Sequence, residues 1–211
     1  MSDEKILAWH FVGERLRDGR PVPPDGQLLV HVGPAELYRC GLHASPLLRD
    51  AVRDRGQFLR VPTLCRVEVG DVVARDASRL VCRERRILWR IDATEILNDI
   101  ASRCLWQLRY VHNVYAAIAY RAAFSDEDTA GGRAYTAFSN AAWALEREAG
   151  GDPLGRASDA WLSAVDEQNA WLEAAAERVH AGTYETWTPA QETNQAATTV
   201  ATAVPTAERS E

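Results

Sequence analysis

Alternating apolar and polar positions in the first half of the chain predict a β-sheet. Residues 63–70 (TLCRVEVG) place Cys65 and Val67 on one side and Arg66 and Glu68 on the other, the period of a strand with one face in solvent. Cys65 is then expected in the core, where a free thiol packs as a small apolar group. Three further runs are rich in strand-forming residues: 5–12 (KILAWHFV), 27–32 (QLLVHV) and 85–91 (RRILWRI).

One short helix is predicted among these strands. Ser45 is typical of an N-cap, Pro46 of the first helical position and Gly56 of a helix stop. A parallel nucleotide-binding sheet needs more crossover helices than this one. The fold class expected for residues 1–92 is therefore α+β, with a small mixed sheet and one short helix.

From Asp92 onward the apolar residues recur every three or four positions, the spacing of amphipathic helices. Asp92 and Glu95 are typical of a capping box at the start of the first helix. The pattern predicts helices from 92 to about 123, from 135 to about 150 and from 153 to 182. Short connections between them favour an all-α bundle of about three helices over residues 93–182.

The last segment, residues 183–211, is rich in Thr, Ala and Gln, with scarcely any large apolar side chain after Trp187. Such a segment buries too little surface to offset the entropy lost on ordering. We therefore predict three parts along the chain: an α+β module (1–92), a helical bundle (93–182) and a disordered tail (183–211).

Charge narrows the range of partners. The chain has a formal net charge of −6, so nucleic acid is an unlikely general partner. Basic residues do cluster at Arg83, Arg85 and Arg86 around Glu84. Strand alternation would put Arg83 and Arg85 on one face and Glu84 and Arg86 on the other. We expect this cluster to be solvated sheet surface.

The sequence also bears on compartment and metal binding. No stretch approaches the roughly 20 apolar residues of a membrane-spanning helix, and the N-terminus lacks the features of a secretory signal. We expect a cytoplasmic protein with four reduced cysteines and no membrane partner. Cys40 and His43 form a C-x-x-H pair, but the second close pair of a zinc site is missing, so no metal is expected.

Three segments in order carry a family resemblance: YRCGLHASPLLRDAV, LCRVEVGDVV and SRLVCRERRILWRIDATEIL. They resemble a family of uncharacterised proteins found in bacteriophage, prophage and bacterial genomes. Its mark is a Cys-x-Gly-Leu/Phe-His-Ala/Phe-Ser/Cys core, which here runs from Cys40 to Ser45 without the residue between Cys and Gly. Some relatives continue into Ala- and Trp-rich helices to which an immunity role has been attributed, and AFSNAAWALEREAG is similar to these. The resemblance implies a phage or mobile-element setting, including association with virions, and no established reaction.

The core hexapeptide holds the main ligand-binding candidates. Gly41 allows backbone geometry closed to other residues, and His43 and Ser45 supply polar groups just before the predicted helix. The alternative is purely structural: Gly41 is a bend, His43 a hydrogen-bonded turn residue and Ser45 an N-cap.

The same segment is loosely similar to the NAD-cradling part of ADP-ribosyltransferase folds. That resemblance implies that His10 and His43 hold NAD and that Glu84 or Glu68 steadies the ribose. No nucleophile–His–carboxylate order, Walker loop or dinucleotide glycine fingerprint is present. Outside this alternative, no cofactor is expected.

Seven tryptophans are many for 211 residues. Trp106, Trp143, Trp161 and Trp171 fall in the predicted helices, where indoles fill gaps between helices or, if exposed, anchor partners. Trp106 lies two positions from both Cys104 and Leu108 of the apolar stripe, so it points about 200° away from each. The sequence therefore favours a non-enzymatic interaction protein that binds a protein partner or itself. The alternative is a nucleotide-binding or ADP-ribosyltransferase-like domain.

Overall fold

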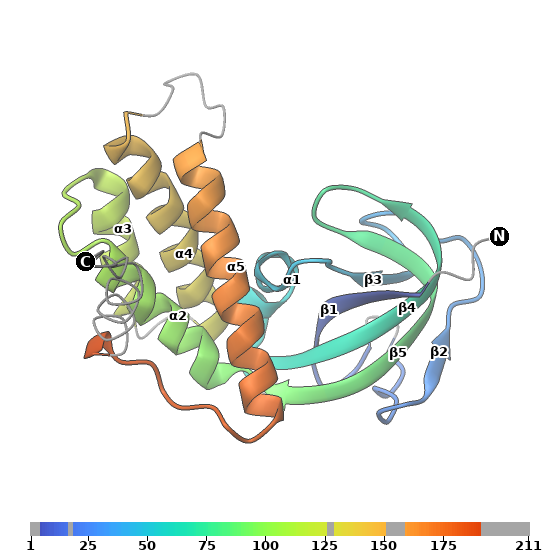
Figure 1. The fold of residues 1–211 in the computed structure, drawn as a ribbon. Coiled ribbons are helices and arrows are strands. Elements are labelled where there is room, and N and C mark those ends of the chain that lie inside the picture. Colours follow the sequence, from blue (N-terminus) through green and yellow to red (C-terminus); the bar gives the residue numbers. More distant parts are fainter. Residues whose placement is uncertain (1–4, 17–18, 126–128, 151–158, 191–211) are drawn as a thin grey trace, which may run out of the picture.

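The computed structural model describes residues 5–16, 19–125, 129–150 and 159–190 (Figure 1). A curled sheet lies on one side, helices lie on the other, and a short helix lies between them. The strands are β1 (Ile6–Val12), β2 (Leu28–Val30), β3 (Leu42–Ala44), β4 (Thr63–Arg75) and β5 (Leu80–Asp92). This arrangement confirms the predicted combination of a sheet with helices. The prediction of a mixed sheet is wrong, because every strand pair among the described residues is antiparallel.

The sheet is built on a long hairpin of β4 and β5 and runs in the order β1-β4-β5-β2. The outer edge of β5 pairs with two short strands, β2 along one part and β3 along another. Register shifts at Arg66/Val67 and Val72/Ala74 mark irregularities that bend a strand. At the far side, Trp9 and Ser45 exchange two backbone hydrogen bonds of 2.8 and 2.9 Å. The sheet therefore curls until the end of β3 meets β1.

Curling gives the sheet two apolar faces. Along β1, Ala8 and Val12 belong to an inner cluster, whereas Trp9 and Phe11 belong to a larger cluster shared with the helices. Cys65 lies in the inner cluster with no exposed surface, which confirms its predicted place in the core. The strand period of two explains how neighbouring residues serve different cores.

The helices differ in number from the prediction. In the described part of the chain they are α1 (Leu48–Asp54), η1 (Gly56–Phe58), α2 (Thr94–Gln107), α3 (Val114–Ala123), α4 (Ala130–Glu148) and α5 (Asp159–His180). The predicted first helix of the bundle is two helices, because Asn113 accepts hydrogen bonds from the backbone N–H groups of Tyr115 and Ala116 and begins α3. The apolar pattern hides the break, since Val111 within it is also buried. The predicted helix start at residue 153 lies outside the described residues.

One large core joins the sheet to the helices. It extends from Trp9 and Leu64 to Phe138 and Leu172, across the sequence boundary at residue 92. Arg49 of α1 lies within this junction. Its backbone N–H donates to Asn169 Oδ1 at 3.1 Å, its Nε donates to Gln168 Oε1 at 3.2 Å, and its guanidinium lies 4.6 Å from the Phe138 ring. These contacts fix α1, and hence the wall of the site described below, against α4 and α5.

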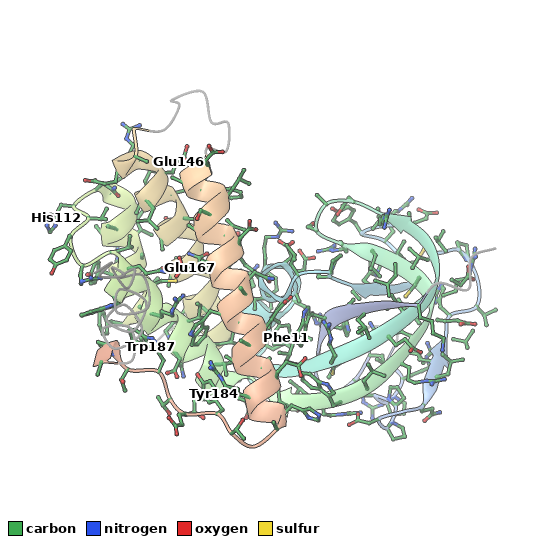
Figure 2. The ribbon with its side chains drawn as sticks, in the orientation of Figure 1. Phe11, His112, Glu146, Glu167, Tyr184 and Trp187 are labelled. Carbon is green, nitrogen blue, oxygen red and sulfur yellow. The ribbon has the colours of Figure 1, made fainter. Side chains whose placement is uncertain are left out.

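The prediction of a tail disordered from residue 183 is wrong for residues 183–190, which lie along α2 (Figure 2). Asp99 of α2, 7% exposed, accepts hydrogen bonds from the Tyr184 hydroxyl at 2.7 Å and from the Trp187 backbone N–H at 2.6 Å. Two aromatic side chains give this stretch more surface to bury than the Thr- and Ala-rich residues after it. Residues 191–211 lie outside the described residues. None of the described helices combines the length and apolarity needed to cross a membrane.

We expect Tyr184→Phe to lower the free energy of unfolding by about 1–3 kcal/mol, because a hydrogen bond to a buried carboxylate is lost. Urea denaturation measures this change. Tyr110→Phe is the matched control, since the Tyr110 side chain is 78% exposed. Equal stabilities for Tyr184→Phe and the wild-type protein would show that the segment is not held by this contact.

Candidate functional site

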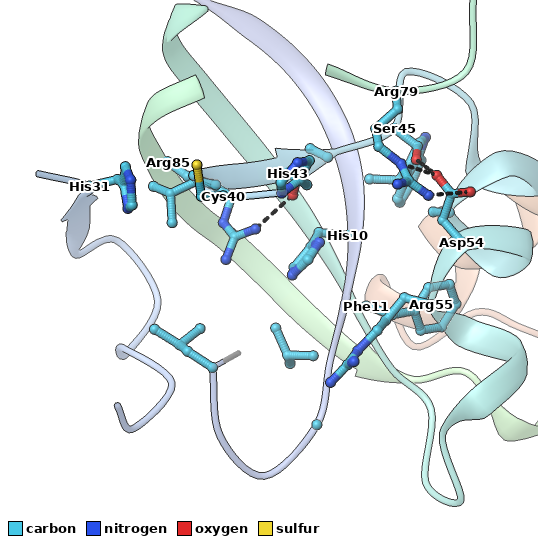
Figure 3. Close-up of a pocket in the computed structure, with 18 of the residues that line it drawn as sticks. His10, Phe11, His31, Cys40, His43, Ser45, Asp54, Arg55, Arg79 and Arg85 are labelled. Carbon is cyan, nitrogen blue, oxygen red and sulfur yellow. Dashed lines mark hydrogen bonds and ion pairs between the residues drawn. The ribbon is translucent and has the colours of Figure 1, made fainter. Parts of the chain in front are cut away.

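A pocket of about 400 Å³ opens where β1, β3 and α1 meet (Figure 3). Four of the ligand-binding candidates from the sequence line it: His10, Gly41, His43 and Ser45. The backbone pair between Trp9 and Ser45 brings them together, because His10 directly follows one partner and His43 lies just before the other. The sequence thus indicated the segments that line this pocket without showing how they meet.

Gly41 holds the backbone at the entrance to β3. Its φ of 102° lies in the region that favours glycine. A Cβ atom there would lie 2.7 Å from Val81 Cγ2 and 3.0 Å from Ala35 Cβ. Gly41 therefore shapes the pocket through its backbone and close packing.

Ser45 is not the helix N-cap predicted from the sequence. The N-cap position is Leu47, without a side-chain capping bond, and α1 begins at Leu48. Pairing with Trp9 keeps Ser45 in the sheet, so the chain turns into the helix only afterwards. The Ser45 hydroxyl instead donates to Asp54 Oδ2 at 3.4 Å.

Arg85 is the pocket residue that sequence reasoning missed. Its side chain was expected on solvated sheet surface, but Arg85 is only 4% exposed. The prediction fails because the curled sheet encloses this face of β5. One guanidinium nitrogen, Nη1, donates to the His43 carbonyl oxygen at 2.8 Å. Within the described ranges, no carboxylate forms an ion pair with Arg85, and burial lowers its pKa.

Arg83, on the same strand, behaves as expected. Its side chain is 43% exposed and lies 3.4 Å from Asp71 Oδ2. Alternation along the strand predicts one face for Arg83 and Arg85, yet only Arg85 is buried.

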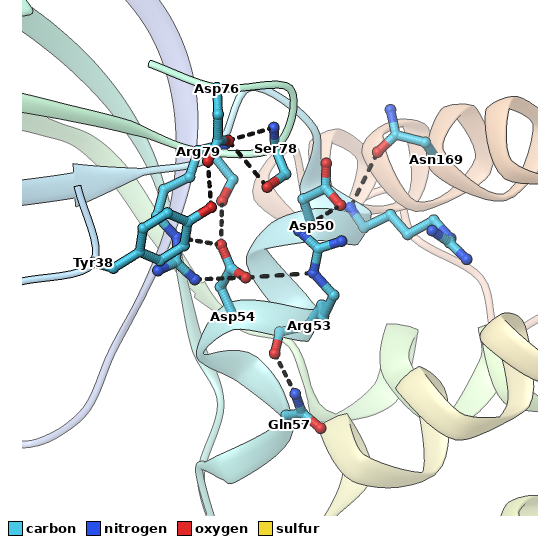
Figure 4. A network of polar contacts seen from close by, with 11 residues as sticks. Tyr38, Asp50, Arg53, Asp54, Gln57, Asp76, Ser78, Arg79 and Asn169 are labelled. Atoms are coloured by element: carbon cyan, nitrogen blue, oxygen red, sulfur yellow. Dashed lines mark hydrogen bonds and ion pairs between the residues drawn. The ribbon is translucent and has the colours of Figure 1, made fainter. Parts of the chain in front are cut away.

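The carboxylate that lines the pocket is Asp54, and its oxygens are occupied (Figure 4). Arg79 donates from Nε to Asp54 Oδ2 at 2.7 Å, and Arg79 Nη2 lies 2.6 Å from Oδ1. Arg53 and Ser45 approach the same carboxylate at 3.4 Å. Asp54 and Arg79 therefore largely neutralise each other.

A neighbouring network holds Arg79 in place. Its guanidinium lies 4.5 Å from the centre of the Tyr38 ring, and the Tyr38 hydroxyl donates to Asp76. This bond and those from the backbone of Ser78 and Arg79 lower the pKa of Asp76 to about 2. Asp76 thus remains a carboxylate that fixes the turn between β4 and β5.

His10 faces cations in the pocket. Burial lowers its pKa well below the usual value, and nearby Arg85, Arg55 and His43 lower it further. His10 is therefore neutral at pH 7. Neither ring nitrogen forms a hydrogen bond with the described part of the protein, so both face the pocket or solvent.

Glu84, the candidate acid of the transferase alternative, is not among the residues that line the pocket. Its Oε2 lies 3.1 Å from where a Cβ atom on Gly70 would be, beside β4. The structure thus brings His10 and His43 together but not with Glu84. The described residues contain no group of three side chains suited to hold a metal ion.

The four tryptophan candidates lie in different surroundings. Trp161 and Trp171 pack against core clusters, and Trp143, 36% exposed, lies with its ring 6.1 Å from that of Trp161. Trp106 is half-buried, with the Arg109 guanidinium 4.2 Å from its ring. Most of these indoles therefore contribute to packing between helices, and their use in docking stays a prediction.

No family model, curated protein or solved structure matches this chain. The resemblance to phage and prophage proteins stays a prediction from the sequence. The chemistry of the pocket is therefore the basis for assigning a function.

We expect His10→Gln to make the fold less sensitive to acid. The unfolded chain takes up a proton on His10 as the pH falls below about 6.5, whereas the folded protein resists it. The free energy of unfolding of the wild-type protein therefore decreases as the pH falls through that range. Thermal melts from pH 7.5 to 5 should show a smaller decrease for His10→Gln than for the wild type. The exposed His112→Gln is the control, and a decrease as large in His10→Gln would contradict the assignment.

Proposed function

We propose that this protein binds a small anionic molecule in the pocket between β1, β3 and α1. The observation that carries the proposal is the buried Arg85 guanidinium, which has no carboxylate partner in the described part of the chain. Removing an ion from water without a partner costs several kcal/mol. An anion in the pocket would offset that cost.

The rest of the pocket supports an anion in the same place. Arg55 also lines it with an exposed side chain, and no ion pair joins Arg55 to any described carboxylate. The whole chain has a formal net charge of −6, so the positive charge of the pocket is a local property. A cavity of about 400 Å³ lies in the range of small-molecule sites. The half-buried Leu16 offers apolar surface to the uncharged part of a ligand.

Binding is better supported than transferase chemistry. An ADP-ribosyltransferase would need a carboxylate free to act on the ribose. Asp54, the acid among the described lining residues, is already engaged by Arg79, Arg53 and Ser45. NAD is therefore one candidate ligand, held through its phosphates.

A second role, binding of a protein partner or self-association by the helices, follows from the leading interpretation of the sequence. Exposed aromatic side chains on and around α3 and α4 support it: Tyr110 (78%), Phe124 (76%) and Trp143 (36%). We expect Phe124→Ser to reduce self-association measured by size-exclusion chromatography with light scattering. A wild-type protein that stays monomeric at high concentration would contradict self-association.

We expect millimolar phosphate, AMP or NAD to raise the melting temperature, with uncharged adenosine giving no shift. Arg85→Met keeps a side chain of similar length and removes the charge, so it should weaken anion binding about 10- to 100-fold, the range for a lost charge-assisted hydrogen bond. Arg83→Met, on the same strand but paired with Asp71, is the matched control.

The unliganded Arg85→Met protein should melt close to the wild-type temperature, because an uncompensated buried charge is gone. A flat response of the wild type to every anion would overturn the proposal. So would equal responses of the Arg85→Met and wild-type proteins.

A further inference from the structure

Three strands contribute titratable or charged groups to one part of the pocket: His10 comes from β1, His43 from β3 and Arg85 from β5 (Figure 3). Arg55, which ends α1, also lines the pocket, but its side chain is exposed and extends away from these three. The residue opposite His10 on β4 is Cys65, a buried thiol whose pKa is raised to about 11 by burial. No carboxylate appears among the groups that act on His10. A bound anion would therefore be the first negative charge to act on His10.

We propose that the ligand is a phosphate monoester and that His10 takes up a proton when the phosphate binds, which makes the pocket selective for a doubly charged group. This inference rests on the proposed function and names the class of ligand for the same site.

Charge matching favours the phosphate monoester. A monoester carries about −1.5 to −2 at pH 7 and has three strong acceptor oxygens. Arg85 and a protonated His10 together would carry two positive charges inside the pocket. A carboxylate or a phosphodiester supplies a single negative charge and would leave one of these two groups uncompensated. The planar guanidinium of Arg85 also suits phosphate oxygens, which it can bind through two parallel N–H groups.

The surroundings of His10 explain the proton uptake. In the free protein its neighbours are cations or other basic groups, which disfavour a charged imidazole. A phosphate within about 4–6 Å reverses the sign of the local field and favours the charged ring. The cationic imidazole has two N–H donors where the neutral ring has one. Since neither nitrogen is engaged by described protein atoms, the new proton adds a charge-assisted hydrogen bond to the ligand.

The size of the pocket favours an ester over free phosphate. A volume of about 400 Å³ exceeds what one phosphate group fills. Leu16, half-buried on the pocket wall, leaves apolar surface for an organic group. A mononucleotide or a sugar phosphate has the required charge at one end and this kind of bulk at the other.

Calorimetric titration tests both parts of the inference. At pH 7, AMP should bind at least about tenfold tighter than 3′,5′-cyclic AMP, the singly charged diester, because tenfold corresponds to the loss of about 1.4 kcal/mol. Sulfate isolates His10, since its own charge is constant between pH 5.5 and 7.5. Its affinity should rise as the pH falls, by up to about tenfold per pH unit for one coupled proton.

His10→Gln should remove most of this pH dependence. His31→Gln is the matched control, because His31 also lines the pocket but its Nε2 lies 2.8 Å from the Pro34 carbonyl oxygen. Equal affinities for AMP and cyclic AMP would overturn the inference. An unchanged pH dependence in His10→Gln would overturn it as well.

Proton uptake can also be measured without a variant, by titrating sulfate into the wild-type protein at pH 7 in Mops and in Tris. These buffers absorb different amounts of heat when they lose a proton, so an uptake of a substantial fraction of one proton is expected to separate the two curves. No uptake overturns the inference while leaving the proposed function intact. Failure of phosphate, sulfate and AMP to bind at any of these pH values overturns the proposed function itself.

Discussion

The backbone hydrogen bonds between Trp9 and Ser45 close the gap between β1 and the end of β3. Without this pair the sheet would end at two open edges. His10 on β1 and His43 on β3 would then not face a shared space. With it, the sheet curls, and Arg85 on β5 becomes enclosed rather than solvated. The pocket is therefore a consequence of sheet closure, and its charge follows from which side chains the closure encloses.

Electrostatics then divides the pocket into two parts. Near α1, Asp54 and Arg79 neutralise each other and are held by a wider polar network. Deeper in the pocket, Arg85 has a carbonyl oxygen but no carboxylate as its partner among the described residues. Packing of α1 on α4 and α5 through Arg49 supports this wall of the pocket from behind. The helical region thus contributes to the site by fixing α1.

Local patterns in the sequence predicted much of the fold but little of its curvature. Alternation around Cys65 located β4 and its inner face, because that signal lies within a few residues. Strand β3 has three residues, too few for any period to show. The burial of Arg85 was missed because it depends on the pairing of β5 with distant segments. The break before Asn113 was hidden because the apolar spacing continues through it. The position of Tyr184 was missed because it depends on a hydrogen bond to the distant residue Asp99.

In the proposed function, an anion supplies the partner that the described part of the protein does not provide for Arg85. Nitrogen NMR of the arginine side chains measures this directly, with Arg83 as an internal reference on the same strand. On addition of phosphate or AMP, the Nε–H signal of Arg85 should shift and its exchange with water should slow, while that of Arg83 stays unchanged. Binding that leaves the Arg85 signal unmoved would show that Arg85 does not hold the anion.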